Sequence, residues 1–441
     1  MQIEDPFKII DVHGRMILDS RGNPTVEVEV KTPTGFGRAA APAGASKGKH
    51  EALELRDGGK EFHGMGVRKA VNNVNNIIRP RLIGLDVRLQ RTIDKLLCEL
   101  DGTPNKSRLG ANAIVATSLA VAKAAANSLK LPLYRYIGGI GSYIMPVPML
   151  NIINGGVHAG NELSFQEFMI APVGADSFSE AIRIAVEVYK TLKQVLKNTY
   201  GANAINVGDE GGFAPPMRLN REALDALTKA IKMAGYTEKD VVLAIDAAAS
   251  QLYDPGKGVY YVDGREMMPS DLLEYYLILV DEYAIVSIED PFHEDDFESF
   301  KLLTSKLRSR VLIVGDDLYV TNPLRLRKGI EVGATTAVLV KVNQVGTLSE
   351  AIEVTLEAQR AGLRAIISHR SGETEDTTIA HLAVGLRTGL IKTGAPCRGE
   401  RTAKYNELLR IEEELAGEAI YPGLEAFKPS APLPSLKPLV K

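Results

Sequence analysis

Apolar and polar residues follow two different patterns along this chain. Near the N-terminus, Val alternates with Thr and Glu over residues 25–30, which predicts a half-buried strand in an antiparallel pair with residues 9–18. Apolar residues then recur at helical spacing over residues 67–78, in a helix expected to end before Pro80, and over residues 107–129, with the first residue as the helix cap. These elements predict a smaller N-terminal α+β domain over residues 1–141, which ends at a glycine cluster.

Beyond residue 141 the pattern changes to short apolar runs separated by helical stretches. The runs occupy residues 241–245, 284–288, 311–314, 336–340, 363–368 and 389–391, with an earlier one at 204–207. Their ends lie about 25 to 45 residues apart, which is the length of a βα unit. Residues 145–153 and 165–171 are strand-like and closely spaced, so we expect an antiparallel hairpin to open the fold. The predicted fold class is α/β, with a TIM-like β/α barrel over residues 142–441.

Polar residues close almost every one of these runs. In chain order they are Asp209, Glu210, Asp246, Glu289, Asp316, Lys341, His369, Arg370 and Lys392. The C-terminal ends of the strands in a β/α barrel meet on one face, which carries the active site in enzymes of this architecture. We therefore expect these side chains to converge on one cavity.

Three of these residues, Asp246, Glu289 and Asp316, are carboxylates that end successive strands. Carboxylate oxygens suit a hard cation such as Mg²⁺, which keeps room in its octahedral shell for oxygens of the substrate. The competing interpretation is that each acid caps the helix after its strand. That is common for one acid, but it requires a threefold coincidence here.

Basic and amide side chains add to the predicted site. Lys341 stands in the apolar sequence Val-Leu-Val-Lys-Val, and a buried lysine without a role is rare. His158 lies in the Gly-rich loop 151–160, and Gln166 and Glu167 fall on a predicted strand.

An anion site is predicted just before a helix start. Arg370 and Ser371 lie there, and a guanidinium, a hydroxyl and a helix N-terminus together bind anions. With Lys392 they indicate a phosphate, although a carboxylate fits as well. Residues 44–49 resemble a phosphate-binding loop, but the spacing is one residue short and His50 replaces Ser or Thr.

Composition excludes several classes of protein. The chain has 441 residues, more than one hydrophobic core normally supports, so two domains are expected. A formal net charge of −3 provides no basic field for nucleic acid. Two cysteines make no disulfide framework, which fits a reducing cytoplasm, and no apolar stretch is long enough for a membrane span.

Taken together, these motifs resemble those of the enolase family over almost the whole chain. The matching segments are LDSRGNPTVEVEV (18–30), GAS (44–46), the loop around residue 158, QE (166–167), GDEGG (208–212), SIEDPF (287–292), GDDL (315–318), KVNQ (341–344), ISHRSGETED (367–376) and IKTG (391–394). The resemblance implies a hydro-lyase, phosphopyruvate hydratase, of glycolysis and gluconeogenesis. Its reaction is the reversible, magnesium-dependent dehydration of 2-phospho-D-glycerate to phosphoenolpyruvate.

The resemblance also implies two Mg²⁺ per active site and assigns roles by position. Asp246, Glu289 and Asp316 resemble the ligands of the first ion, and Ser46 resembles a ligand of the second ion, which binds with the substrate. Ene-diolates formed at such sites are stabilised by the cations, which are also expected to lower the pKa of the lysine base.

The proton-transfer roles follow from the same resemblance. Lys341 resembles the base that removes the C2 proton, and Glu210 the acid that protonates the C3 hydroxyl and is expected to keep its proton in a crowded acidic site. Glu167 and His158 resemble supporting residues at the hydroxyl end of the substrate. The other residues implied to bind the substrate or line the site are Gln166, Glu289, Asp316, His369, Lys392, and Arg370 with Ser371 at the phosphate.

The expected partners are the small substrate and further copies of the chain. The family suggests a homodimer or an octamer of dimers in the cytoplasm, while a secondary presence at the cell surface cannot be read from the sequence. Two alternatives stand beside this interpretation. A lyase or racemase of the same superfamily acting on a sugar acid would share the barrel acids but would not need Ser46, Arg370 and Ser371 together. An inactive scaffold on the same barrel would not need an intact Lys341 and Glu210.

Overall fold

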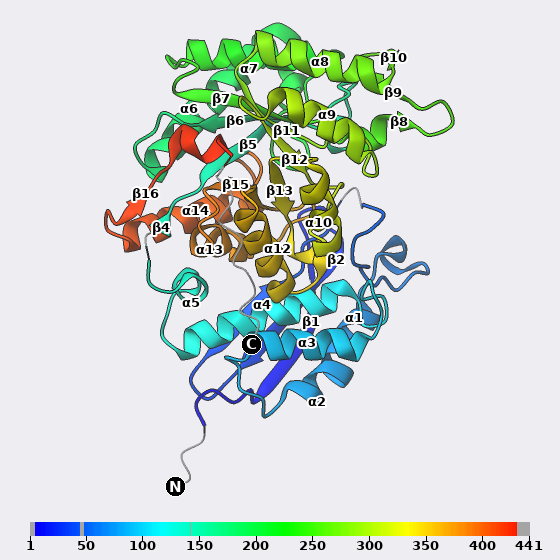
Figure 1. The fold of residues 1–441 in the computed structure, drawn as a ribbon. Coiled ribbons are helices and arrows are strands. Elements are labelled where there is room, and N and C mark those ends of the chain that lie inside the picture. Colours follow the sequence, from blue (N-terminus) through cyan, green and yellow to red (C-terminus); the bar gives the residue numbers. More distant parts are fainter. Residues whose placement is uncertain (1–4, 45–47, 142, 430–441) are drawn as a thin grey trace, which may run out of the picture.

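The computed structural model describes residues 5–44, 48–141 and 143–429 (Figure 1). The N-terminal part contains a three-stranded antiparallel sheet of β1 (Asp11–Leu18), β2 (Pro24–Lys31) and β3 (Phe36–Ala40). The predicted strand pair is confirmed, with Met16 opposite Val26 and Gly14 opposite Val28. Val26 and Val28 are fully buried, because side chains alternate across a strand and the valine face packs on helix α4 (Ala111–Ser128).

The predicted helix at 107–129 is four residues shorter at its start. Gly110, at φ +97, precedes α4 without a side-chain cap, and the backbone N–H of Ser107 instead donates to Thr103 Oγ1 in the preceding turn. The serine is therefore part of the turn and not the cap. Small residues allow α4 to lie directly on the sheet, since a Cβ at Gly37 would stand 2.1 Å from the carbonyl oxygen of Ala120.

The prediction that a helix ends before Pro80 is wrong. Helix α1 (Arg68–Asn73) continues through a π-helical turn, η2 (Val74–Ile78), into α2 (Arg79–Leu82), which contains Pro80. The π turn ends just before the proline, so Pro80 enters at the start of a new α-helical turn, where no backbone donor is required. The remaining elements of this part are η1 (Glu61–Gly64), α3 (Gln90–Asp101) and α5 (Leu133–Gly138).

The second part is a closed eight-stranded barrel, as predicted. Around the barrel the strands are β11 (Ile285–Glu289), β12 (Leu312–Gly315), β13 (Ala337–Val340), β14 (Arg364–Ser368), β15 (Leu390–Lys392), β5 (Val147–Asn154), β6 (Glu167–Pro172) and β7 (Val241–Asp246). Strand β6 runs antiparallel to both neighbours, which confirms the opening hairpin. The run at 204–207 is not a strand, because η4 (Ala202–Ile205) and a loop carry the chain from α6 toward α7 there.

Helices surround the barrel in chain order. They are α6 (Phe178–Tyr200), α7 (Asn220–Met233), α8 (Pro269–Glu282), α9 (Phe297–Leu307), α10 (Pro323–Val332), α11 (Val342–Val345), α12 (Leu348–Arg360), α13 (Thr378–Gly385) and α14 (Gly399–Glu414). Short elements complete the fold: β4 (Tyr143–Ile144), β8 (Tyr253–Asp254), β9 (Val259–Val262), β10 (Arg265–Met267), β16 (Ala419–Ile420), η3 (Gly156–His158), η5 (Ala249–Leu252) and η6 (Gly423–Phe427). Within the described part of the chain, no helix combines the length and apolar character needed to cross a bilayer.

The inside of the barrel is layered, and its last layer is polar. The lower layers are apolar side chains that belong to one buried cluster, such as Ala244, Val314 and Leu339. Because side chains alternate along a strand, the residue two positions further on faces the same interior. The upper layer thus takes one residue from each strand or its end: Asn151, Glu167, Asp246, Glu289, Asp316, Lys341, Ser368 and Lys392.

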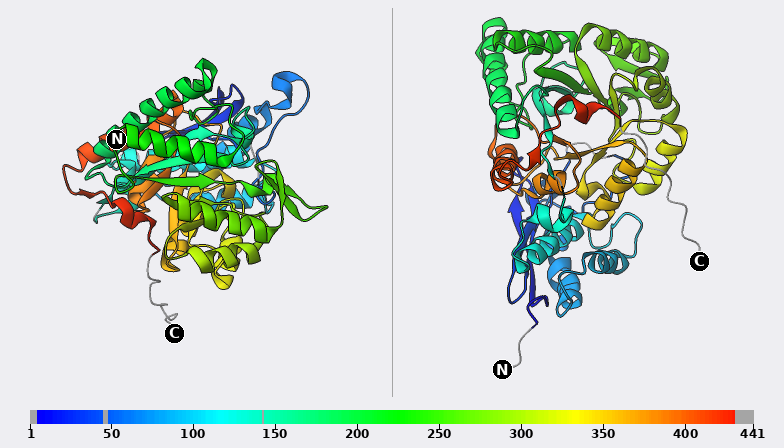
Figure 2. Two further views of the ribbon diagram at one scale, coloured as in Figure 1. Left: turned by 90° about the horizontal axis from the view of Figure 1, so that it is seen from above. Right: turned by 60° about the vertical axis from the view of Figure 1, so that its left-hand side comes forward.

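The N-terminal sheet lies at the opposite end of the molecule from helices α7 and α8 (Figures 1 and 2). The chain that leaves β3 reaches the barrel directly, since Ala43 and Gly372 exchange backbone hydrogen bonds of 2.8 Å in both directions. Further along, the N–H of Ala52 donates to the carbonyl of Gln344 at 2.8 Å. Residues 43–44 and 48–52 therefore border the polar end of the barrel.

Candidate active site

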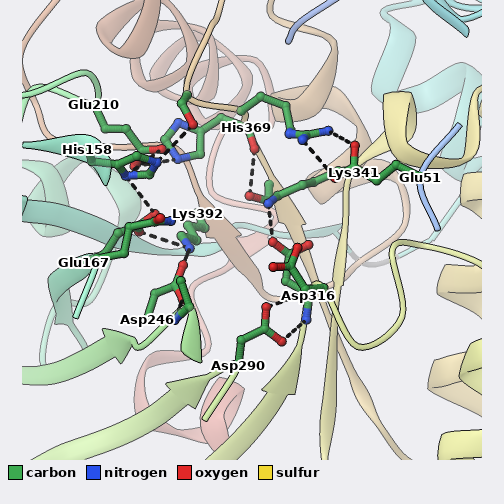
Figure 3. A pocket seen from close by; sticks show the side chains of 16 residues that line it. Glu51, His158, Glu167, Glu210, Asp246, Asp290, Asp316, Lys341, His369 and Lys392 are labelled. Atoms are coloured by element: carbon green, nitrogen blue, oxygen red, sulfur yellow. Dashed lines mark hydrogen bonds and ion pairs between the residues drawn. The ribbon is translucent and has the colours of Figure 1, made fainter. Parts of the chain in front are cut away.

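A polar pocket of about 430 Å³ lies at this end of the barrel (Figure 3). The predicted site residues that line it are His158, Gln166, Glu167, Glu210, Asp246, Asp316, Lys341, His369, Arg370, Ser371 and Lys392. Glu289 is fully buried just beneath the pocket and contacts Lys392. Ser46 lies outside the described residues. Side chains from segments far apart in sequence are thus brought together, as the strand-end pattern indicated.

Lys392 connects the carboxylates on one side of the pocket. Its Nζ lies 3.0 Å from Asp246 Oδ2, 2.8 Å from Glu289 Oε2 and 3.0 Å from Glu167 Oε2. Burial alone would lower the pKa of Lys392, but these carboxylates outweigh it and hold the pKa well above its usual value. Burial, followed by the charge of Asp246, raises the pKa of Glu289 well above its usual value. Lys392 is therefore a fixed positive charge within an acidic cluster.

Lys341 makes the corresponding contact across the pocket. Its Nζ donates to Asp316 Oδ2, while Gln344 Nε2 donates to Asp316 Oδ1 at 3.0 Å. Burial would lower the pKa of Lys341, yet the Asp316 carboxylate prevails and raises it. Burial would likewise raise the pKa of Asp316, but Lys341 lowers it instead. The ion pair with Asp316 raises the pKa of Lys341 because it stabilises the ammonium form, whereas bound cations are expected to lower that pKa.

A second group surrounds His158, which is 4% exposed. Its Nδ1 lies 3.7 Å from both Glu167 Oε1 and Glu210 Oε1, and Ser371 Oγ lies 3.1 Å from its Nε2. Glu210 Oε2 accepts a hydrogen bond of 3.0 Å from Asn151 Nδ2. Two buried carboxylates thus flank one imidazole.

The surroundings of Glu210 act on its pKa in two opposite directions. Burial favours the neutral form, but His369 and His158 outweigh it and hold the pKa of Glu210 well below its usual value. Burial and then the Glu210 charge raise the pKa of Glu167 well above its usual value. Two adjacent buried carboxyl groups do not both ionise readily, so ionisation of one of this pair favours the neutral form of the other.

The predicted anion residues have a carboxylate partner that the sequence did not suggest. Arg370 donates from both terminal nitrogens to Glu51, at 3.0 and 3.1 Å, and from one of them to Asn343 Oδ1 at 3.2 Å. Such a two-pronged contact is the geometry in which a guanidinium binds carboxylate or phosphate. Glu51 is therefore a residue of the site that comes from the N-terminal part of the chain.

Asp290 and Asp317 extend the acidic side of the pocket. Asp290 accepts the backbone N–H groups of Asp316 and Asp317 at 3.0 and 2.8 Å, which orients the Asp316 side chain. Burial, followed by the charge of Asp316, raises the pKa of Asp317 to about 8. Burial, followed by the charge of Asp317, also raises the pKa of Asp290 well above its usual value, so the surroundings favour the neutral form of both carboxyl groups.

The donor atoms fit a hard cation. Within the described residues, ligand atoms close enough to share one ion form two groups, His158 with Glu167 and Glu210, and Asp290 with Asp316 and Asp317. Of the three predicted ligands of the first ion, only Asp316 belongs to one of these groups. Lys392 and Lys341 supply positive charge to Asp246, Glu289 and Asp316, and a divalent cation on the same oxygens would supply it too. His158 Nδ1 and Gln166 Oε1 are buried without a hydrogen-bond partner among the described residues, which leaves them available to a substrate.

Several site residues escaped the sequence analysis for identifiable reasons. Asp290 and Asp317 directly follow predicted residues, and an acid beside another acid adds no new pattern. Glu51 follows a glycine-rich loop whose distance from the barrel cannot be read from spacing. Arg401 lies on α14 in a charge-rich stretch typical of a solvated helix, yet it is fully buried beneath the pocket. A buried polar residue in such a stretch carries no periodic signal.

Sequence comparison gives a consistent family over the whole chain. Residues 9–137 match the family described as "Enolase, N-terminal domain", and residues 142–430 match "Enolase, C-terminal TIM barrel domain". The chain is 64% identical to the enolase of Thermococcus kodakarensis over 97% of its own length and 100% of that protein. It is also 64% identical to the enolase of Pyrococcus furiosus (96% and 98% covered) and 63% identical to that of Methanocaldococcus jannaschii (94% and 97% covered). The chain belongs to the enolase family.

Proposed function

We propose that this pocket carries out the family reaction with Lys341 as the base and Glu210 as the acid. The chain is a lyase of glycolysis, a phosphopyruvate hydratase that interconverts 2-phospho-D-glycerate and phosphoenolpyruvate. The observation that carries the residue assignment is the placement of these two side chains at opposite sides of one pocket, with Lys392 between them (Figure 3). A substrate held between them presents its C2 proton to one and its C3 hydroxyl to the other.

The residues that would hold Mg²⁺ are Asp246, Glu289 and Asp316 for one ion and Ser46 for a second. When bound, the ions would neutralise the charge that develops on the substrate carboxylate as the C2 proton leaves. Lys341 must give up its contact with Asp316 and lose a proton before it can accept one from C2. Glu210 must carry a proton when it acts on the C3 hydroxyl, and Glu167, on the far side of His158, is a nearby carboxyl group whose pKa is raised.

The phosphate would bind at Arg370 and Ser371. The two guanidinium nitrogens that contact Glu51 suit phosphate oxygens equally well. The substrate phosphate would therefore either displace Glu51 from Arg370 or share the guanidinium with it. Ser371 also contacts His158, which links the phosphate end of the site to the hydroxyl end. Gln166, His369 and Lys392 would complete the lining.

Two variants separate the proposed steps. Lys341→Ala should abolish exchange of the C2 hydrogen with solvent, because no base remains, and dehydration should be lost with it. Glu210→Gln should retain C2 exchange but lose dehydration by roughly a factor of 10² to 10⁴, which is the usual contribution of a general acid. Exchange is followed by NMR of 2-phosphoglycerate in D₂O, and dehydration by the absorbance of phosphoenolpyruvate.

Lys328→Ala serves as a matched control, since Lys328 lies outside the pocket on α10 and contacts the ring of Phe297. It should leave both rates unchanged. Normal dehydration by Lys341→Ala, or loss of exchange in Glu210→Gln, would contradict the assignment. Turnover of a sugar acid without turnover of 2-phosphoglycerate would favour the alternative function, a lyase or racemase that acts on a sugar acid.

Metal removal gives an independent test. Treatment with EDTA should stop turnover of 2-phosphoglycerate, and added Mg²⁺ should restore it, since the carboxylates alone cannot stabilise the charged intermediate. Titration calorimetry with Mg²⁺ should give one site without substrate and a second with a substrate analogue. Full turnover in excess EDTA would refute the requirement.

We also propose a homodimer or an octamer of dimers, a cytoplasmic location, and a domain boundary near residue 141. The two cysteines are free, which suits a reducing compartment. A molar mass by light scattering at least twice that of one chain is expected, and a monomer at micromolar concentration would rule out the assembly.

A further inference from the structure

Arg401 is a fully buried arginine directly behind the pocket. It lies near the start of α14, and its side chain is 0% exposed. A buried guanidinium is costly unless its donors are used, because it always carries a charge and has no acceptor atom. The targets of its donors therefore indicate what it stabilises.

All the hydrogen bonds of the Arg401 terminal nitrogens go to two loops of the site. One nitrogen donates to the carbonyl oxygen of Ser371 at 2.6 Å and to that of Asp209 at 3.2 Å. The other donates to the carbonyl oxygen of Arg370 at 2.6 Å and to Nδ1 of His369. One side chain thus joins the backbone beside Glu210 to the segment that would bind phosphate.

The contact with His369 fixes the position of a proton. Because a guanidinium only donates, Nδ1 of His369 must accept with its lone pair, and the neutral imidazole must carry its hydrogen on Nε2. That Nε2 lies 3.2 Å from Glu210 Oε2, with an angle outside that of a directed hydrogen bond, as is common before substrate binds. The N–H of His369 is therefore presented to Glu210.

Other features keep His369 neutral and leave room for Arg401. Burial first, and then the charge of Arg401, lower the pKa of His369 to about 3 against the opposing influence of Glu210. Gly394, at φ +81, passes beside the guanidinium stem, and a Cβ there would stand 2.9 Å from Arg401 Cδ and 2.8 Å from the Glu210 carbonyl oxygen. The backbone at Gly394 is thus shaped around both residues.

We infer that Arg401 is a positioning residue for the dehydration step, which holds His369 as the Nε2–H tautomer so that His369 donates to Glu210. This inference rests on the proposed role of Glu210 as the acid. A donor at one oxygen of Glu210 directs the acidic proton to the other oxygen. Without Arg401, Nδ1 can take the hydrogen, and Nε2 then presents a lone pair that competes for the proton of Glu210.

The test compares Arg401→Gln and Arg401→Lys with the wild-type protein. We expect the ratio of kcat for dehydration to the rate of C2 exchange at saturating substrate to fall about tenfold or more in Arg401→Gln, because only the acid step depends on the tautomer, whereas a shift of the phosphate-binding segment would raise KM for both reactions alike. ¹⁵N-histidine NMR should show His369 as the Nε2–H tautomer in the wild type and a shift toward Nδ1–H in the variants. A change of packing alone would not move the tautomer.

Lys404→Met is the matched control. Lys404 is a buried cation on the same helix, and it pairs with Glu373 at 3.0 Å. Within the described residues, it forms no hydrogen bond or ion pair with His369. This variant should lower stability but keep the wild-type ratio of dehydration to exchange and the wild-type tautomer. An equal loss of that ratio in Lys404→Met and Arg401→Gln would overturn the inference, since the effect would then follow from any loss of charge in α14.

A second pair of variants covers the case in which Arg401→Gln does not fold. Glutamine at 369 places an amide N–H near the position of Nε2 without a tautomer to choose, so Arg401→Lys should change the ratio in the wild-type background and leave it unchanged in His369→Gln. Equal effects in both backgrounds would overturn the inference. If Glu210→Gln dehydrates normally, the proposed function of Glu210 fails; if it does not and Arg401→Gln does, only the role of Arg401 fails.

Discussion

At the scale of single residues, the pocket depends on two amines that neutralise its acids, those of Lys392 and Lys341. Lys392 contacts Glu167, Asp246 and Glu289, and all four side chains lie in the polar upper layer of the barrel. Removing one partner of a buried ionic group leaves the others uncompensated, which costs more than the group itself contributes. The acids therefore make Lys392 important for stability, independently of its proposed role at the substrate.

Lys392→Met should destabilise the fold by about 3 to 5 kcal/mol, the cost typical of a broken buried ion pair. Urea unfolding in EDTA measures this loss, and added Mg²⁺ should reduce it, because a cation on Asp246 and Glu289 would replace the missing charge. Lys404→Met, which removes a buried lysine paired with one acid, should lose less and gain nothing from Mg²⁺. A Lys392→Met loss unaffected by Mg²⁺ would contradict this account.

The residues at strand ends were predictable because two periodicities coincide. A short apolar run predicts a strand, and the polar residue at the C-terminal end of that strand must lie at the barrel mouth. Asp246, Asp316 and Lys341 were predicted in this way. Their pairing was not predictable. Lys341 pairs with Asp316 and Arg370 with Glu51 because strands and loops far apart in sequence meet, and spacing along one segment contains no such information.

At the scale of elements, the N-terminal sheet carries a charge cluster on its outer face. Arg15 donates to Glu29 at 2.9 Å and Arg38 donates to it at 2.7 Å, from the neighbouring strands β1 and β3. The hydrogen bond from Arg15 lowers the pKa of Glu29 to about 2, with burial opposing it and Arg38 adding to it. Cross-strand pairs of opposite charge stabilise a sheet in this way.

This pKa gives the sheet a defined pH dependence. A carboxylate whose pKa is lowered on folding contributes stability that is complete above its unfolded value and is lost as pH falls from 4.5 to about 2. Arg15 and Arg38 are 34% and 54% exposed, so solvent screens the pairs and Glu29→Gln should cost only about 1 kcal/mol at neutral pH. The difference between Glu29→Gln and wild type should vanish near pH 2. Glu187→Gln, at an exposed pair with Arg183, should show no measurable change.

Element prediction succeeded where one face is buried and failed where local geometry is unusual. Strand β2 alternates cleanly, so its pairing with β1 could be predicted from its pattern. The helix continues through Pro80 by way of a π-helical turn. Residues 204–207 form the end of η4 and the start of a loop, although most of them are apolar. Neither a π-helical turn nor an exposed loop produces a recognisable periodicity of apolar residues in the sequence.

At the scale of the whole molecule, the two parts of the chain share one site. Glu51 reaches Arg370 from the N-terminal part, and the paired backbone of Ala43 and Gly372 holds the chain that leaves β3 against the barrel. The barrel alone would therefore lack the carboxylate that holds Arg370. We expect a barrel fragment expressed by itself, provided that it folds, to discriminate less well than the full chain between ligands with and without a phosphate group.

The closure of the barrel has a consequence for how an active molecule arises. Strand β15 is the last barrel strand to be synthesised, and it closes the ring by pairing with β5, the first, with Leu390 beside Val147. Lys392 arrives on that same strand. Until β15 pairs with β5, the carboxyl groups of Glu167, Asp246 and Glu289 lack the amine that neutralises them, and their mutual repulsion opposes their assembly at the barrel mouth. Pairing of β15 with β5 thus both closes the ring and neutralises its mouth, so we expect activity during refolding to appear only once the ring is closed.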